Sequence, residues 1–151
     1  MALRASGHGF RTYIAQFMKG LHYGELDAIK RLGDSIIIEQ FGRKDLIHVE
    51  TADMEDVEMA SKALGRAMER MLSGDFQIII LDEVNVAIHF KLLKVEEVME
   101  LIRLRPENVE LVLTGRYAPS AFVEAADLVT EMRKIEHYYD NGLEARRGIE
   151  F

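Results

Sequence analysis

Two adjacent carboxylates, Asp82 and Glu83, follow a short apolar run in the segment FQIIILDE at 76–83. A buried strand with two acids at its tip is the pattern of a Walker B strand. The strand holds the carboxylates rigidly, so that one can bind Mg²⁺ directly and the other through water, beside the phosphates of a nucleotide. The alternative is structural, with Asp82 capping the next segment or pairing with a lysine. The pattern predicts a nucleotide site and leaves this alternative open.

Three further polar residues follow apolar runs in the same way. Lys19 comes just after TYIAQFM, where it is either a ligand for phosphate or a surface lysine in a turn. Thr114 and Arg116 end the segment VELVLTGR. The guanidinium of Arg116 suits a bidentate contact with phosphate, but it suits an ion pair with Asp82 or Glu83 equally well. These residues are candidates for phosphate binding.

The usual companion of a Walker B strand is a glycine-rich loop, G-x-x-x-x-G-K-[ST], whose backbone N–H groups bind phosphates. No window of the sequence matches it. The histidines have no metal-ligand spacing, and no arrangement of Ser, His and Asp stands out. The residues therefore indicate no nucleophile and no general base.

Apolar runs and helical patterns alternate along the chain and must position these residues. The expected strands are 12–18, 35–41, 76–83, 109–115 and 127–133. The expected helices are the last turns of one at 1–6, a long one between Asp53 and Gly74, one ended by Pro106, and a short one at 120–126. This alternation predicts an α/β fold with a mostly parallel sheet. Such sheets bind ligands at the carboxyl ends of their strands, where the candidate residues stand.

Composition excludes several classes of protein. The 151 residues carry a net charge of −7, which argues against a general nucleic-acid binder. The chain has no cysteine, and its apolar runs are too short to span a bilayer. With 48% hydrophobic and 30% charged residues, we expect one cytoplasmic domain over 1–151, without nucleic-acid or membrane partners.

The motifs resemble a known family when they are taken in order. The ordered segments are GHGF, QFMKG, LDE, RP, LTGR, ADLVTEMR, HYYD and GIEF. This series resembles the P-loop type of ATP:corrinoid adenosyltransferase of the cobalamin pathway, over nearly the whole chain and most weakly between 21 and 55. The resemblance implies transfer of the 5′-deoxyadenosyl group of ATP to the cobalt of a reduced corrinoid, cob(I)alamin or cob(I)yrinic acid diamide, with release of triphosphate. Cobalt would be the nucleophile, which agrees with the missing base.

The resemblance also assigns roles to residues. Glu83 matches the Mg²⁺-binding acid of the family, and Asp82 is a supporting second acid. Lys19, Thr114 and Arg116 would face the same site. The family uses bulky aromatic residues to displace the lower ligand of the corrinoid, and in QFGRKDL at 40–46 the candidate is Phe41. The resemblance further implies a homodimer and a separate electron donor, a reductase or a flavoprotein.

One departure from the family concerns phosphate binding. Family members have a strand and a Walker A loop just before the helix that corresponds to residues 1–6, and this sequence contains neither. We therefore expect a RecA-like P-loop NTPase fold that lacks its first strand and P-loop, with unpaired edges on the neighbouring strands. Two hypotheses follow. The sequence is an adenosyltransferase that begins partway along a helix, or it is a P-loop-less paralogue that binds corrinoid or a full-length partner subunit without ATP chemistry.

Overall fold

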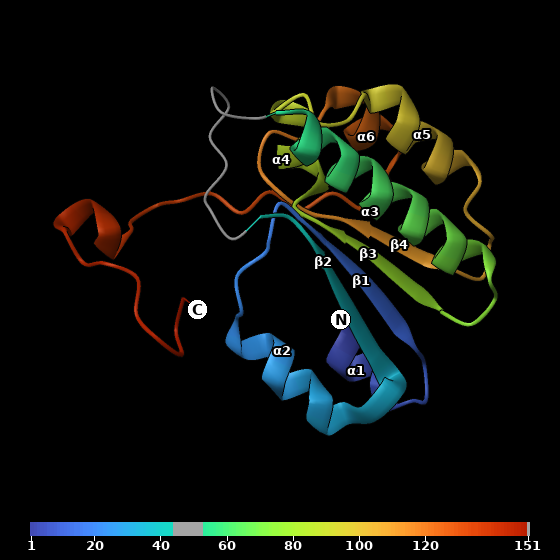
Figure 1. Ribbon diagram of the computed structural model, residues 1–151, viewed down its shortest axis with the longest axis horizontal. Coiled ribbons are helices and arrows are strands. Elements are labelled where there is room, and N and C mark those ends of the chain that lie inside the picture. Colours follow the sequence, from blue (N-terminus) through green and yellow to red (C-terminus); the bar gives the residue numbers. More distant parts are fainter. Residues whose placement is uncertain (44–52, 151) are drawn as a thin grey trace.

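A parallel sheet forms the centre of the computed structural model, which describes residues 1–43 and 53–150. Its strand order is β2-β1-β3-β4, and every neighbouring pair is parallel. The strands are β1 (Thr12–Phe17), β2 (Ile36–Phe41), β3 (Ile78–Asp82) and β4 (Glu110–Leu113) (Figure 1). The predicted α/β class with a parallel sheet is confirmed, and the arrangement is consistent with a RecA-like P-loop NTPase fold.

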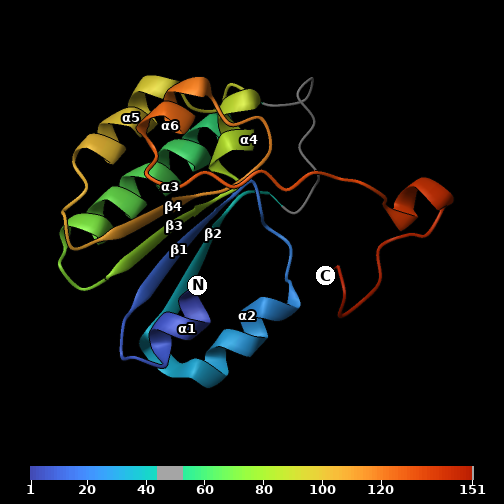
Figure 2. The ribbon, with the colours of Figure 1, turned by 180° about the vertical axis from the view of Figure 1, so that it is seen from behind.

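Helices cover both faces of this sheet. On one side lie α3 (Met54–Leu72), α4 (Val84–His89), α5 (Val95–Arg103) and α6 (Ser120–Ala125). On the other side lie the short helices α1 (Ala2–Ser6) and α2 (Gly24–Ile29), as both views show (Figures 1 and 2). Residues Lys30–Ser35 and Tyr138–Asn141 form 3₁₀ helices. Among the described residues, no helix is both long enough and apolar enough to cross a bilayer.

The main core lies between α3 and strands β1 and β3. Helix α3 presents three fully or nearly fully buried alanines, Ala60, Ala63 and Ala67, which let its backbone approach the sheet. The predicted start of this helix is confirmed, because the Asp53 carboxylate accepts the N–H groups of Glu55 and Asp56. N-cap bonds of this kind satisfy donors that have no partner within the helix. These bonds therefore stabilise the first turn of α3.

The prediction of a strand over 127–133 is wrong. All residues from 123 to 150 are exposed, and 127–133 has no strand pairing. Large apolar side chains stand in solvent there, with Leu128 82% exposed and Met132 94% exposed. A strand forms only where a neighbour completes its hydrogen-bond ladder. In the described part of the chain, β4 ends the sheet on one side and no strand pairs with its outer edge.

Candidate functional site

The carboxyl ends of three adjacent strands bring Lys19, Asp82 and Thr114 together. Strand β1 pairs with β3 through Gln16 and Asp82, and β3 pairs with β4 through Leu81 and Leu113, so the three strands end at one level. The Lys19 ammonium donates to Oδ2 of Asp82 at 2.9 Å. The Thr114 hydroxyl donates to Oδ1 of the same carboxylate at 2.9 Å. Three of the candidate residues therefore form one hydrogen-bonded cluster, and Asp82 does pair with a lysine, as the structural alternative proposed.

Lys19 is more than a surface lysine, since only 29% of its side chain is exposed. Burial by itself lowers the pKa of an ammonium group. Here the pKa of Lys19 is raised above its ordinary value, because its hydrogen bond to Asp82 and the negative charge of that carboxylate outweigh the effect of burial. Glu25 and Glu83 make smaller contributions in the same direction. Lys19 therefore holds a positive charge at the strand ends at neutral pH.

The buried amide of Gln16 donates a hydrogen bond to the carboxylate of this ion pair. Gln16 is only 4% exposed, and its Nε2 donates to Asp82 Oδ2 and to Glu25 Oε1, each at 3.3 Å. Its Oε1 accepts from Gln40 Nε2 at 3.1 Å. Sequence reasoning missed Gln16. The available signal was an amide in the otherwise apolar run TYIAQFM, directly before the strand end.

Glu83 stands at the tip of β3 in an unusual backbone conformation. Its φ of 65° and ψ of 19° lie in the left-handed region, which is unfavourable for a residue with a side chain. The backbone N–H of Glu83 donates to the Thr114 hydroxyl at 3.0 Å, which fixes this turn. The glutamate side chain then lies beside the backbone of Gly115, where an added Cβ would come 3.2 Å from Oε2. The strained turn thus places the second carboxylate next to the first.

The two carboxylates have different freedom to bind a metal ion. Both oxygens of Asp82 already accept hydrogen bonds, whereas the carboxylate of Glu83 accepts none from the described residues. Across 1–43 and 53–150 there is no cluster of three or more acidic or histidine side chains that could enclose a metal. Magnesium held with a nucleotide needs only one or two carboxylates, because waters and phosphate oxygens complete its shell. Glu83, supported by Asp82, fits that kind of ion.

The side chains of Arg116 and Phe41 take no part in the hydrogen bonds of this cluster within the described residues. Arg116 is exposed, and within the described residues it forms no ion pair with Asp82 or Glu83, so that alternative is wrong. Its guanidinium carbon lies 5.7 Å from the centre of the Tyr117 ring. Phe41 is half-buried against the core and lines a groove of about 690 Å³ between β2 and α3. Residues 44–46 of QFGRKDL and the last residue of GIEF lie outside the described residues.

The fold is of the α/β class and is consistent with a P-loop NTPase-like arrangement, and comparison with known proteins is more specific. The whole chain, residues 1–151, matches the family described as ATP:corrinoid adenosyltransferase BtuR/CobO/CobP. It is 33% identical to a corrinoid adenosyltransferase of Pseudomonas aeruginosa, over 100% of this chain and 74% of that protein. It is 36% identical to one of Sinorhizobium sp over 100% of this chain and 72% of that protein, and 29% identical to one of Escherichia coli K12 over 99% and 76%. The chain belongs to the ATP:corrinoid adenosyltransferase family.

Proposed function

We propose that this chain transfers the 5′-deoxyadenosyl group of ATP to the cobalt of a reduced corrinoid, cob(I)alamin or cob(I)yrinic acid diamide. In this reaction the Co(I) centre of the substrate attacks the 5′ carbon of ATP. The bond from that carbon to the phosphate oxygen breaks, and triphosphate leaves with the electron pair. The cobalt is thereby oxidised to Co(III) and bonded to carbon. No proton is removed, so the protein needs no general base.

The observation that carries this proposal is the convergence of Lys19, Asp82 and Thr114 at the strand ends, with the Glu83 carboxylate beside them. A reaction whose nucleophile belongs to one substrate needs the protein to orient both substrates and to stabilise the leaving group. A fixed ammonium and a free carboxylate at one edge of the sheet meet that need. Family membership supports ATP and a corrinoid as the two substrates.

Each residue has a distinct role in the proposed site. Lys19 binds the triphosphate and stabilises its charge as it leaves, because its ammonium is charged and held by Asp82. Thr114 holds Asp82 and the backbone of Glu83 in place. Arg116, exposed at the end of β4, supplies a second cation for the phosphates. Glu83 and Asp82 would hold Mg²⁺, which neutralises phosphate charge when it is bound.

The remaining parts of the proposal follow from the family resemblance. Phe41 contacts the corrinoid from the groove that it lines with β2 and α3. A separate reductase or flavoprotein supplies the electrons that form Co(I). The chain works in the cytoplasm as a homodimer, in cobalamin synthesis or salvage.

The direct test is an anaerobic assay of the 151-residue chain with ATP, Mg²⁺ and chemically reduced cob(I)alamin. Formation of the cobalt–carbon bond is followed by the change in corrinoid absorbance, and the product is recognised because light cleaves that bond. We expect turnover, with Lys19→Met lowering kcat/KM by roughly 10²-fold, the size of effect seen when one charge-stabilising donor is removed. The matched control is Lys30→Met, because Lys30 also pairs with an aspartate but is 70% exposed and lies away from the strand ends.

Two results would contradict the proposal. One is the absence of cobalt–carbon bond formation by the folded natural chain, whereas full turnover in Lys19→Met would overturn only the role given to Lys19. The other is corrinoid binding by the folded chain with no measurable binding of ATP in calorimetry, which would favour the alternative of a corrinoid-binding paralogue without ATP chemistry.

A further inference from the structure

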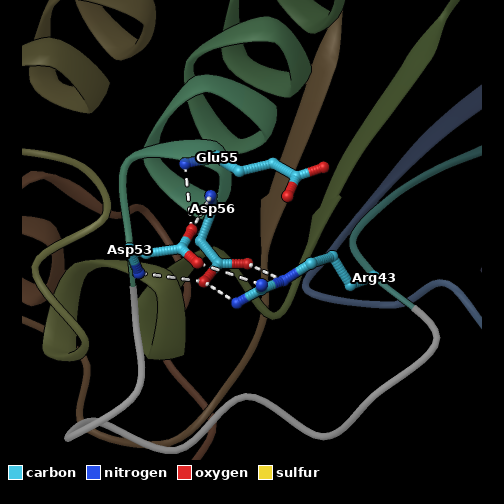
Figure 3. Close-up of polar contacts among 4 residues, drawn as sticks. All are labelled: Arg43, Asp53, Glu55 and Asp56. Carbon is cyan, nitrogen blue, oxygen red and sulfur yellow. Dashed lines mark hydrogen bonds and ion pairs between the residues drawn. The ribbon is translucent and has the colours of Figure 1, made fainter.

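Arg43, just beyond the end of β2, makes a forked contact with the first turn of α3. Its Nε donates to Oδ1 of Asp56 at 2.9 Å, and its Nη2 donates to Oδ2 of the same carboxylate at 2.5 Å. A third nitrogen, Nη1, donates to the N-cap residue Asp53 at 3.0 Å. Figure 3 shows the planar guanidinium lying across both carboxylates. This bidentate geometry is specific to arginine, because the single ammonium of lysine cannot reproduce it.

The partner of this fork is a fully buried carboxylate. The side chain of Asp56 is 0% exposed, while that of Arg43 is 30% exposed. Besides the two guanidinium donors, Asp56 Oδ2 accepts the backbone N–H of Asp53 at 3.1 Å. A buried carboxylate must be paired in this way, and removal of its partner leaves an uncompensated charge in the interior. Arg43 is therefore held firmly against α3.

The backbone at Arg43 lies directly against the segment that carries Lys19. The N–H of Met18 donates to the carbonyl of Phe41 at 2.9 Å. An added Cβ at Gly20 would lie only 2.4 Å from the carbonyl oxygen of Arg43, and one at Gly42 would lie 2.5 Å from the backbone nitrogen of Lys19. Both positions therefore require glycine. The backbone of residues 42–43 therefore packs directly against the backbone of residues 18–20.

We propose that Arg43 is a positioning residue for Lys19. Its bidentate contact with Asp56 fixes residues 42–43 relative to α3. Because residues 18–20 pack against 42–43, this contact also fixes the backbone position from which the Lys19 ammonium reaches Asp82 and the leaving triphosphate. The inference rests on the proposed function for the identity of the anion that Lys19 binds. The contact itself involves no substrate, so Arg43 acts through Lys19 and not on the reacting atoms.

The test compares Arg43→Met with Arg66→Met, a matched control. Arg66 also joins α3 to β2, through Glu39 at 3.3 Å, and its side chain is 38% exposed, but it lies away from Lys19. The first readout is hydrogen exchange of the backbone amides of residues 18–21, followed by mass spectrometry in the protein without substrate. We expect Arg43→Met to speed this exchange about tenfold, because loss of the fork should raise the equilibrium constant for local opening of residues 18–21 by about that factor. Arg66→Met should leave it unchanged.

The second readout is the kinetic constants for ATP. We expect Arg43→Met to raise the KM for ATP about tenfold, a change of one decade in binding, with a smaller effect on kcat. Arg43→Lys keeps the charge without the fork, so it should fall between Arg43→Met and the natural chain in both readouts. It also provides the comparison if Arg43→Met does not fold.

The outcomes separate this inference from the proposed function. Unchanged exchange at 18–21 in both Arg43 variants, or equal acceleration in Arg66→Met, would overturn the positioning role even if Lys19→Met abolishes turnover. Full turnover in Lys19→Met would overturn only the phosphate-binding role proposed for Lys19, and absence of turnover by the folded natural chain would overturn the proposed function. In either case the exchange result at 18–21 would still decide whether Arg43 fixes that backbone.

Discussion

The Lys19 ammonium donates to Asp82 at 2.9 Å although 63 residues separate the two in the chain. Neighbouring parallel strands produce this contact, because β1 and β3 end at the same level of the sheet. The carboxylate of the next residue, Glu83, accepts no hydrogen bond from the described residues. It is therefore available to bind a ligand. A charged pair that is only about one quarter exposed is screened less by salt than a surface pair.

Removal of the Thr114 hydroxyl should reduce stability. Thr114→Val takes the acceptor from the Glu83 backbone N–H and a donor from Asp82, and both groups are partly buried. An unsatisfied group of this kind costs about 1–3 kcal/mol in the free energy of unfolding. Thr114→Ser keeps the hydroxyl and should retain most of that free energy. Urea unfolding of the two variants measures the difference, and equal losses in both would contradict the role of the hydroxyl.

The left-handed backbone of Glu83 predicts that two substitutions at this position differ in stability although both lose activity. Glycine adopts this conformation freely, whereas a residue with a Cβ is strained there by roughly 1–2 kcal/mol. We therefore expect Glu83→Gly to be about 1 kcal/mol more stable than Glu83→Ala, with the conformation at a φ of 65° unchanged. Both variants should lose Mg²⁺-dependent turnover. Chemical denaturation of the pair checks the stability order, and the reverse order would argue against strain at this turn.

Two glycines should respond to alanine in opposite directions. At Gly20 an added Cβ would meet the carbonyl oxygen of Gly42 at 2.3 Å, so the backbone must move. We expect Gly20→Ala to lower the free energy of unfolding by about 1–3 kcal/mol. Gly65 in α3 has no atom within 4 Å of an added Cβ. Gly65→Ala should therefore stabilise the helix by about 1 kcal/mol, and thermal unfolding of both variants compares them.

A surface cluster of His22, Asp27 and Lys30, around α2, predicts a pH dependence. Hydrogen bonds from Lys30 and then His22 lower the pKa of Asp27 from 3.8 to about 2. A carboxylate whose folded pKa is depressed contributes stability above its unfolded pKa and loses it as the pH falls through the folded pKa. The stability difference between the natural chain and Asp27→Asn should therefore persist at pH 5 and disappear as the pH falls from 3.8 towards 2. Titration followed by NMR measures the pKa directly, and in Lys30→Met it should return towards 3.8.

Local patterns in the sequence were enough to predict most of the fold and part of the site. The runs of β1 to β4 predict strands because short, mostly apolar segments rich in Val and Ile are typical of parallel sheets covered on both faces. The convergence of Lys19, Asp82 and Thr114 follows from their positions after parallel strands. Segment 127–133 also contains apolar residues, Leu128, Val129 and Met132, but composition does not reveal whether a neighbouring strand is present to pair with it.

Contacts that depend on strand register or on the packing of a helix could not be predicted. The bond from Gln16 to Asp82 spans 66 residues and depends on the register of β1 against β3, which no local pattern encodes. The fork of Arg43 on Asp56 likewise depends on where α3 is packed. Sequence periodicity places Asp56 in the first turn of that helix, but it does not show that the carboxylate is buried or that an arginine after β2 reaches it.

The long separation between Lys19 and Asp82 also bears on how the protein folds. Strands β1 and β3 are neighbours in the sheet, but β2 and α3 separate them along the chain, so closing the contact closes a long loop at an entropic cost. Proteins with many such distant pairings fold slowly, in milliseconds to seconds. We therefore expect ligand-binding competence to be acquired late in refolding, after helix α3 has formed and collapsed onto β1.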